Sequence, residues 1–382
     1  MKIERRSERT HKPFVRVVST AFASIVVGVI LAAFLAGSGQ VLAASSGRTI
    51  TDQNKNVVAL PDKFDRIVTS SMWPLTHMLY IVNGSADNIA GMHPASKSAG
   101  INSMFGLLSP SISKAITDFI SPSDVLNIEE LMKLNPDIVY YRGENTPEEE
   151  ILLKSPIPSA AFRVTIYAGD AVETGASWID QLGEIAMKDT IAPRYRERAR
   201  KSMEMISERV KDIPDSKKPR VMIINRHSEK EIIVANKSYA SYWIKQTGAL
   251  NAAEELEASR AVNMEEIYKW NPDIIYITNF TPTLAEDLLK NKVNGQDWSG
   301  LSAVKNGRVY KNPLGMYRWY VPNSDAPMML EWMAQKNYPE LFRDIDIRYE
   351  LREYYKEFYN YGLTEENLDM ILNPAREGAS GV

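Results

Sequence analysis

The sequence predicts an α/β protein made of two similar lobes, and three observations carry that prediction. The stretch NIEELMKLNPDIVYY from Asn127 returns as NMEEIYKWNPDIIYI from Asn263, with nine of the first fourteen positions identical. The offset of 136 residues (263 − 127) is the size of a small domain, and is too long for a solenoid period of about 20–50 residues. The 339 residues after Ala43 (382 − 43) are enough for two hydrophobic cores. The repeat therefore indicates one supersecondary unit in each lobe.

Each copy of the repeat predicts a helix, a sharp stop and a buried strand. Asn127 and Asn263 suit the cap of a helix N-terminus, and the glutamates that follow favour the positive end of the helix dipole. The Asn-Pro pair ends the helix, because the residue before a proline is pushed out of the α region. The runs 138–141 and 274–278 are apolar and partly β-branched, which is typical of buried parallel strands.

The first 43 residues predict an export signal. Basic residues precede an uncharged apolar run from Ala21 to Ala36, and small residues follow up to Ala43. We expect cleavage, because these sixteen residues are short for a hydrocarbon core of about 30 Å; an uncleaved anchor is the alternative. The sequence has no cysteine, which argues against disulfides, thiolate metal ligands and a lipid-modified cysteine. We therefore expect a freely diffusing periplasmic monomer that is not a lipoprotein.

The rest of the chain divides into a first lobe, a connecting pair of helices, a second lobe and a tail. The first lobe, 46–170, is expected to contain strands at 66–71, 88–92, 138–141 and 160–164 and a helix at 74–82. Helices are expected at 171–187 and 191–212, within a connecting segment 171–213, and the second of them would be about 33 Å long. The second lobe, 219–373, is expected to contain strands at 220–225, 232–236, 274–278 and 307–313 and closing helices at 324–336 and 348–360. We expect the tail 374–382 to be disordered.

The chain resembles a known family in several of these features. The paired helix–NPD–strand units, WSGLSAVKNGRVYKNP (Trp298–Pro313) and EYYKEFYNYGLTEENLDMIL (Glu353–Leu372) resemble the helical-backbone, class III periplasmic substrate-binding proteins of ABC importers, in the iron-siderophore and cobalamin branch. The resemblance covers 46–373. It implies two Rossmann-like lobes with parallel sheets, joined by one long α-helix, with the ligand cleft between the lobes.

The resemblance also implies a function. It predicts capture of an iron chelate of the ferric siderophore type and delivery to the transmembrane subunits of an ABC permease. The same fold could instead bind molybdate or tungstate, haem, cobalamin or a nickel chelate. An alternative of another class is a periplasmic chelatase-like enzyme.

Candidate ligand contacts follow from the rule that open α/β sheets bind ligands beyond the carboxyl ends of their strands. In the first lobe these candidates are Ser71, Trp73, His93, Tyr141 and Arg142. In the second lobe they are Arg226, His227, Tyr239, Asn279, Tyr317, Arg318 and Trp319. Arg142 and Arg318 are the strongest candidates for ligand contact. A guanidinium group can donate two parallel hydrogen bonds to anionic oxygens, and neighbouring aromatic rings can stack on flat ligands. A structural ion pair is the alternative for each.

Several classes of function have no support in the sequence. His93 and His227 each follow a strand and either could ligate a metal, but no His/Asp/Glu cluster has the spacing of a dedicated metal site. There is no serine elbow, HExxH or P-loop, so we expect no enzyme and no cofactor. A net charge of −3 with scattered basic residues argues against nucleic acid as a partner.

One further prediction concerns docking on the permease. The resemblance implies an acidic residue on each lobe that meets arginines of the permease. Counting back from Asn127, Asp118 is the candidate in the first lobe. The matching place in the second lobe contains Tyr242, Trp243 and Lys245 and no acid, which puts a two-point contact in doubt.

Overall fold

The first lobe is built on a parallel four-stranded sheet. The computed structural model describes residues 45–379, so the expected signal segment 1–43 lies outside the described residues. The strand order is β4-β3-β5-β6, and every pairing is parallel. The strands are β3 (Ile67–Thr69), β4 (Ile89–Met92), β5 (Ile138–Arg142) and β6 (Ser159–Phe162). An antiparallel hairpin of β1 (Ser45–Thr51) and β2 (Val57–Pro61) precedes them.

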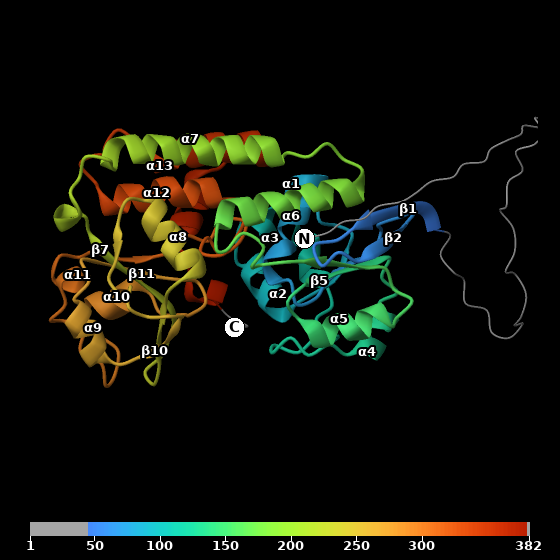
Figure 1. Cartoon of the computed structure of the whole chain (residues 1–382), viewed down its shortest axis with the longest axis horizontal. Coiled ribbons are helices and arrows are strands. Elements are labelled where there is room, and N and C mark those ends of the chain that lie inside the picture. The colour runs from blue at the N-terminus through green and yellow to red at the C-terminus, as the bar shows by residue number, and fades with distance from the viewer. Residues whose placement is uncertain (1–44, 380–382) are drawn as a thin grey trace, which may run out of the picture. The chain divides into compact units, whose positions relative to one another are not determined.

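Short helices surround this sheet (Figure 1). They are α1 (Met78–Asn83), α2 (Pro94–Ile101), α3 (Met104–Leu108), α4 (Ile128–Lys133) and α5 (Thr146–Leu153). The helix predicted over 74–82 is divided into a 3₁₀ turn, Trp73–Leu75, and α1.

The second lobe contains a mixed sheet, which refines the expectation of parallel sheets. Its order is β10-β8-β7-β11-β12, and β9 pairs with the start of β7. The strands are β7 (Arg220–His227), β8 (Ile232–Ala235), β9 (Leu250–Asn251), β10 (Arg260–Val262), β11 (Ile274–Ile277) and β12 (Val309–Lys311). The pairs β7–β11 and β11–β12 are parallel, whereas β8 is antiparallel to β7 and β10. Residues 228–231 connect β7 to β8, and so short a connection closes a hairpin and cannot make a parallel crossover.

The two copies of the NPD phrase make the same contacts in the two lobes. Asp137 accepts a hydrogen bond from the backbone N–H of Arg66 at 2.8 Å, and its own N–H donates to the Arg66 carbonyl at 2.9 Å. Asp273 makes the same two bonds with Arg220, both at 2.8 Å. Each aspartate thus joins its helix–strand unit to the residue that starts or precedes the first strand, in chain order, of the main sheet of its lobe.

The helices of the repeat also end as the sequence predicts. Asn127 caps α4, and Asn263 caps α9 (Met264–Trp270) in a capping box with Glu266. The Asn before each proline, Asn135 and Asn271, has a positive φ of 44° and 40°, outside the right-handed helical region.

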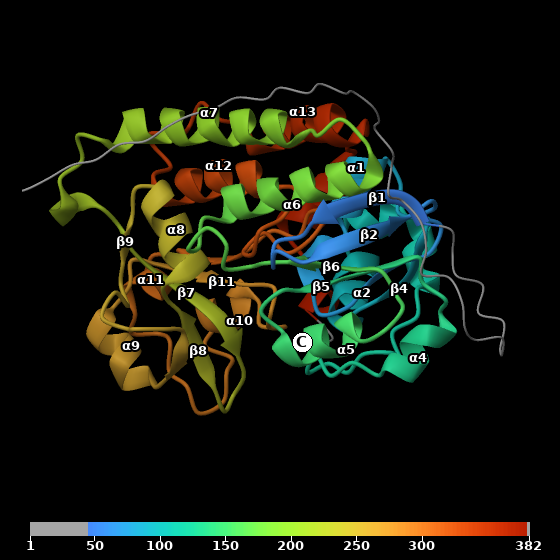
Figure 2. The ribbon, with the colours of Figure 1, turned by 45° about the vertical axis from the view of Figure 1, so that its right-hand side comes forward.

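Two helices connect the lobes, and the second is shorter than predicted. α6 (Ala171–Ala186) packs against α1 of the first lobe, and α7 (Ala192–Val210) packs against α6 and against α12 (Ala326–Asn337) of the second lobe. α7 has 19 residues, hence about 28 Å instead of 33 Å. In Figures 1 and 2, α7 and α13 (Ile347–Tyr359) run side by side over α6 and α12.

The remaining helices belong to the second lobe. They are α8 (Ser238–Gln246), α10 (Ala285–Leu289), α11 (Ser302–Lys305) and α14 (Glu365–Leu372). In the part of the chain that the structure describes, no helix combines the length and apolar character needed to cross a bilayer.

Successive side chains of a strand point to opposite faces of the sheet, so they belong to different cores. In β5, Ile138 and Tyr140 belong to the core under the connecting helices, while Val139 and Tyr141 belong to a core on the opposite face of the first sheet. In β11, Ile274 and Tyr276 face the connecting helices and Ile275 faces the other core of the second lobe. Both sheets are therefore covered on both faces, and the strand ends remain for a site.

The tail differs from the expectation of disorder. Residues Arg376–Ala379 form a 3₁₀ helix, and Gly378 and Ala379 are buried. The rest of the expected disordered tail, 380–382, lies outside the described residues.

Candidate ligand-binding site

A cavity of about 330 Å³ lies between the lobes, beyond the carboxyl ends of the strands. The first lobe contributes Ser71, Met72, Trp73, Pro74, Arg142 and Val164, and the second contributes Asn225, Arg226, Tyr239, Phe280, Tyr317, Tyr320 and Val321. Six residues of the sequence-based prediction line it: Ser71, Trp73, Arg142, Arg226, Tyr239 and Tyr317.

The first-lobe wall is organised by a residue that the sequence reasoning missed, Asp124. Its carboxylate lies 3.0 Å from the Arg142 guanidinium and accepts a hydrogen bond from the Trp73 indole at 2.8 Å. Asp124 lies in a turn with a φ of 61°, far along the chain from both partners. Arg142 therefore reaches the cavity as one half of an ion pair, which was the alternative considered for it.

His93 supports this wall and does not reach the cavity. It is fully buried and its ring stacks on Trp73 with centroids 4.7 Å apart. Its Nδ1 accepts from the N–H of Ala95, and its Nε2 lies 3.1 Å from the Ser121 carbonyl and 3.3 Å from Asp124. Burial lowers the pKa of His93 to about 4, although Asp124 acts in the opposite direction. With both ring nitrogens in use, His93 is a structural residue in this geometry.

A buried carboxyl group lies behind the same wall. Ser71 Oγ donates to Glu148, and Asn145 donates to the same carboxylate oxygen at 3.0 Å. Ser71 Oγ also accepts from the N–H of Arg142 at 3.0 Å, which holds the end of β5 against the loop after β3. Burial raises the pKa of Glu148. This network fixes the backbone from which Arg142 projects.

In the second lobe, Arg226 carries the charge that faces the cavity. Its side chain is exposed, and no hydrogen bond or ion pair joins it to another residue in the described range 45–379. The next residue along β7, His227, points to the opposite face because strand side chains alternate. His227 is buried there, with Nδ1 2.8 Å from Thr283 Oγ1 and Nε2 2.7 Å from Gln296 Oε1. Burial lowers the pKa of His227, and its ring takes no part in the cavity.

The loop between β12 and α12 supplies the aromatic wall, and Asp325 shapes it. The buried Asp325 carboxylate accepts from the Met316 N–H at 2.7 Å, the Trp319 indole at 3.1 Å and the Tyr359 hydroxyl at 2.6 Å. A Cβ on Gly315 would lie 1.9 Å from that carboxylate, so the close approach requires glycine.

This loop also joins the lobes. The Tyr317 ring stacks on His77 of the first lobe, with centroids 5.1 Å apart, and the N–H of Ser324 donates to His77 Nε2 at 3.2 Å.

Arg318 is placed differently from the prediction that it reaches into the cavity. It is fully buried, and its guanidinium lies over the Phe280 ring at 4.9 Å and donates to the Gly378 carbonyl of the tail at 3.2 Å. Burial lowers the pKa of Arg318, and the nearby charge of Arg226 lowers it further. Arg318 thus lies behind the cavity wall formed by Phe280 and Tyr317.

Three further candidates are structural in this geometry, and one is on the surface. Tyr141 is buried on the other face of β5 and donates to Glu149 at 3.0 Å. Asn279 donates to the carbonyls of Asn312 and Pro313 at 2.8 and 2.9 Å, and Trp319 is buried on Asp325. Asp118 is exposed on the first lobe.

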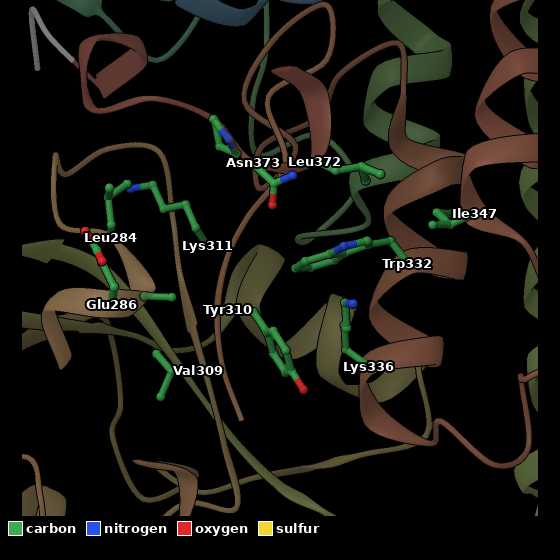
Figure 3. Close-up of a pocket in the computed structure, with 12 residues that line it drawn as sticks. Leu284, Glu286, Val309, Tyr310, Lys311, Trp332, Lys336, Ile347, Leu372 and Asn373 are labelled. Atoms are coloured by element: carbon green, nitrogen blue, oxygen red, sulfur yellow. The ribbon is translucent and has the colours of Figure 1, made fainter. Parts of the chain in front are cut away.

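A second, larger cavity of about 600 Å³ lies within the second lobe (Figure 3). Trp332 and Lys336 of α12, Tyr310 of β12, and Leu372 and Asn373 at the C-terminal end of α14 border it. No first-lobe residue lines this cavity, so it is separate from the site between the lobes.

The described residues contain no cluster of three or more His, Asp or Glu side chains that could hold a metal ion.

Comparison with known proteins places this geometry in a family. A periplasmic solute-binding protein of Veillonella parvula is 31% identical, with 88% of this chain and 99% of the other covered and a TM-score of 0.74. The molybdate-binding protein MolA of Haemophilus influenzae is 23% identical, with 85% of this chain and 94% of MolA covered, and its molybdate-bound structure gives a TM-score of 0.68. The Fe(3+)-citrate-binding protein YfmC of Bacillus subtilis is 24% identical, with 48% of this chain and 56% of YfmC covered. The family model for periplasmic binding proteins matches residues 120–313, and the chain belongs to the periplasmic binding protein family.

Proposed function

We propose that this protein is the substrate-binding component of an ABC importer and that it captures a small anionic metal chelate in the cavity between its lobes. The observation that carries the proposal is Arg226, an exposed guanidinium at the cavity that has no ion-pair partner among residues 45–379. We infer that the expected signal 1–43 directs export, and that the protein delivers its ligand to the permease as a monomer.

The charges around the cavity favour an anion. Arg142 is neutralised by Asp124, whereas Arg226 and the buried Arg318 lie close enough for the charge of one to lower the pKa of the other. Two neighbouring guanidinium groups repel each other, and an anion bound at Arg226 reduces that repulsion. Anionic oxygens also accept the forked N–H donors of arginine in charge-assisted hydrogen bonds.

The size and lining of the cavity favour a chelate over a bare oxyanion. A four-oxygen anion occupies roughly the volume of four waters, about 120 Å³ at 30 Å³ each. The cavity of about 330 Å³ would remain mostly unfilled, and the rings of Trp73, Tyr239, Phe280, Tyr317 and Tyr320 offer faces for the organic part of a chelate. This supports the predicted ferric carboxylate or catecholate chelate, and the YfmC relative is named for a ligand of that kind.

A bare oxyanion, molybdate or tungstate, is the second candidate. The MolA relative, which covers most of both chains, supports it. Haem and cobalamin are less well supported, because the cavity is at the lower end of the range of about 300–1,000 Å³ usual for ligand sites. A nickel chelate belongs to the same size class as ferric citrate.

Titration of intrinsic tryptophan fluorescence tests these candidates together, because Trp73 lines the cavity. The panel is ferric citrate, a ferric catecholate, nickel–histidine, molybdate, tungstate, haem and cobalamin. We expect saturable binding of a ferric chelate and weaker binding of molybdate. Tight binding of molybdate alone would make the oxyanion the ligand, and turnover of a tetrapyrrole would favour the chelatase-like enzyme.

We also propose that the exposed Asp118 contacts the permease when the protein docks on it. The proposal predicts that Asp118→Asn lowers ligand uptake by cells without changing ligand affinity. An unchanged uptake rate would remove Asp118 from the contact with the permease.

A further inference from the structure

Two hydrogen-bond donors of α12 face the larger cavity, the one within the second lobe. Trp332 and Lys336 are four residues apart on this helix (336 − 332), so their side chains are neighbours on one helix face. Figure 3 shows the Trp332 ring extending from α12 toward the cavity and the Lys336 side chain pointing toward that ring. An indole N–H and an ammonium group therefore belong to the same wall.

Trp332 differs from the other tryptophans of the chain in its hydrogen bonding. All seven lie within residues 45–379, and six donate the indole N–H to a protein acceptor: Trp73, Trp178, Trp243, Trp270, Trp298 and Trp319. The Trp332 side chain is buried, yet its indole nitrogen has no hydrogen-bond partner among the described residues. Since a buried indole N–H normally has an acceptor, this donor is available to a ligand.

The ammonium group of Lys336 likewise has no counter-ion among residues 45–379. It is half-buried, and its closest described partner is the Tyr310 ring, whose centroid lies 5.3 Å from Nζ. Burial lowers the pKa of Lys336, and no neighbouring carboxylate acts in the opposite direction. An anionic oxygen would be a stronger partner for this ammonium group than the ring, because charge-assisted hydrogen bonds are the strong ones.

The other charged side chains of this cavity already have partners. The ammonium group of Lys311 donates to three backbone carbonyls of the loop 278–283, at 2.8, 2.5 and 2.9 Å. Glu286 pairs with Lys290 at 2.7 Å. Among the described residues that line the cavity, Lys336 therefore carries the one charge without a protein partner.

The remaining walls favour an organic ligand. Apolar side chains make up most of them: Leu284, Val309, Ile347, Leu372 and Pro374. The volume of about 600 Å³ lies within the range of about 300–1,000 Å³ usual for sites that bind small organic molecules. A bare inorganic anion would leave the apolar walls without a contact, so an anion with an apolar body fits this cavity better.

We propose that this cavity is a second binding site, which takes a small organic carboxylate with an apolar body. The carboxylate oxygens accept hydrogen bonds from Lys336 Nζ and Trp332 Nε1, and the apolar part packs against side chains such as Leu284 and Leu372. No residue lines both this cavity and the cavity between the lobes, so the second site does not rest on the proposed function.

Calorimetric titration of the full chain with 2-naphthoate tests the proposal, and 2-naphthamide is the uncharged probe of the same shape. We expect saturable one-to-one binding of 2-naphthoate and at least about tenfold weaker binding of 2-naphthamide. Lys336→Met should weaken binding of 2-naphthoate about ten- to a hundredfold, and Lys336→Arg should retain most of it, because the charge remains. Equal affinities of wild type and Lys336→Met, or no saturable binding below about 1 mM, would overturn the second site.

Lys245→Met is the matched control. Lys245 is an exposed lysine of α8 in the second lobe, it makes no ion pair with a described residue, and it does not line the cavity. Binding of 2-naphthoate should be unchanged in this variant. Arg226→Ala shows which cavity the probe occupies. A loss of affinity in Arg226→Ala, together with normal binding by Lys336→Met, would place the probe between the lobes and contradict the proposal.

The indole N–H of Trp332 gives an independent readout. In a nitrogen-15 correlation spectrum of the full chain, each of the seven tryptophans gives one indole signal, and the Trp332 signal is the one that Trp332→Phe lacks. We expect 2-naphthoate to shift this signal and to slow exchange of its proton with water, because the carboxylate supplies the missing acceptor. A Trp332 signal that neither shifts nor exchanges more slowly at saturation would rule out this hydrogen bond. The titrations of the Lys336 variants decide the question even if Trp332→Phe does not fold.

Discussion

Asp124 neutralises Arg142, which lines the cavity: their side chains lie 3.0 Å apart, and the acid comes from a turn 18 residues before the arginine (142 − 124). The first lobe therefore offers the ligand a hydrogen-bonding wall with no net charge, and the positive charge comes from Arg226 in the second lobe.

Asp124→Asn should strengthen binding of anionic probes. The change removes one negative charge beside the cavity and leaves Arg142 charged; at about 10 Å and an effective dielectric constant of about 20, one charge contributes about 1.6 kcal/mol. We expect roughly tenfold tighter binding of ferric citrate at low salt, measured by fluorescence, with a smaller gain at high salt. Asp118→Asn, an exposed acid of the same lobe, is the control. Weaker binding by Asp124→Asn would mean that its ion pair positions Arg142 for the ligand.

Arg226→Ala should weaken binding of the same probes about ten- to a hundredfold. A hydrogen bond to a charged group contributes about 1.5–3 kcal/mol. The melting temperature should not change, because Arg226 is exposed and has no bonded partner within the described residues. Arg226→Lys should recover part of the affinity, and Arg343→Ala, another exposed arginine of the second lobe, should have no effect. Normal binding by Arg226→Ala would contradict the anion site.

Arg318→Ala should destabilise the free protein. The substitution leaves a void beside Phe280 and deprives the Gly378 carbonyl of its donor. From the loss of a large buried side chain and a charged hydrogen bond, we expect the free energy of unfolding to fall by about 2–4 kcal/mol, measured in urea. An unchanged unfolding midpoint would show that the Arg318 side chain does not stabilise the fold. It would support the sequence-based prediction that Arg318 contacts the ligand.

Gly315→Ala should be among the most damaging single-methyl additions in this chain. The new Cβ would lie 1.9 Å from Asp325 Oδ2 and 2.6 Å from the Trp319 indole nitrogen, both of which are buried and hydrogen-bonded. Overpacking of this kind costs about 3 kcal/mol, seen as a lower melting temperature. Gly362→Ala is the control, because nothing lies within 4 Å of its added Cβ. Equal melting temperatures for the two variants would contradict the packing of this loop.

Stability should fall at acid pH partly through His77. Burial lowers the pKa of His77 to about 3, so the folded protein keeps it neutral while the unfolded chain protonates it below its ordinary pKa of 6.5. The unfolded state binds more protons in that interval, so stability is lost as pH falls from about 6.5 toward 3, at up to about 1.4 kcal/mol per pH unit.

His77→Gln isolates this contribution. A Gln amide oxygen can accept from the Ser324 N–H, which now donates to His77 Nε2. We expect the variant to be less stable at pH 7, because the stacking on Tyr317 is lost, but to have a shallower decline between pH 6.5 and 4.5 in urea unfolding. Parallel pH profiles for the two proteins would rule out the titration of His77.

The two lobes could be predicted from the repeated segment because the residues that define its helix and strand are close together in the sequence. A cap, two glutamates and an Asn-Pro stop define a helix–strand unit within fifteen residues, and Asn127 and Asn263 cap their helices as predicted. The mixed second sheet was not foreseen, since the direction of β8 depends on the length of one connection.

The site was harder to predict. The sequence shows where a strand ends, but it does not show which of two neighbouring side chains faces the cavity and which faces a core. Arg142 and Arg226 reach the cavity, whereas their neighbours Tyr141 and His227 point into cores. Asp124 was missed because it lies in a turn, outside any strand end. Arg318 follows a strand as predicted, but its contact with Gly378 depends on a tail that no local pattern connects to it.

The bonds between Asp137 and Arg66 and between Asp273 and Arg220 have a consequence for how the chain folds. They close loops of 71 and 53 residues, each inside a single lobe. A chain that is synthesised from its N-terminus can therefore complete the first of these closures before the second lobe has been made. Folding in the order of synthesis is the usual behaviour of multi-domain chains. The repeat thus closes one such loop in each lobe, and the cavity, which both lobes line, can form only when both lobes are in place.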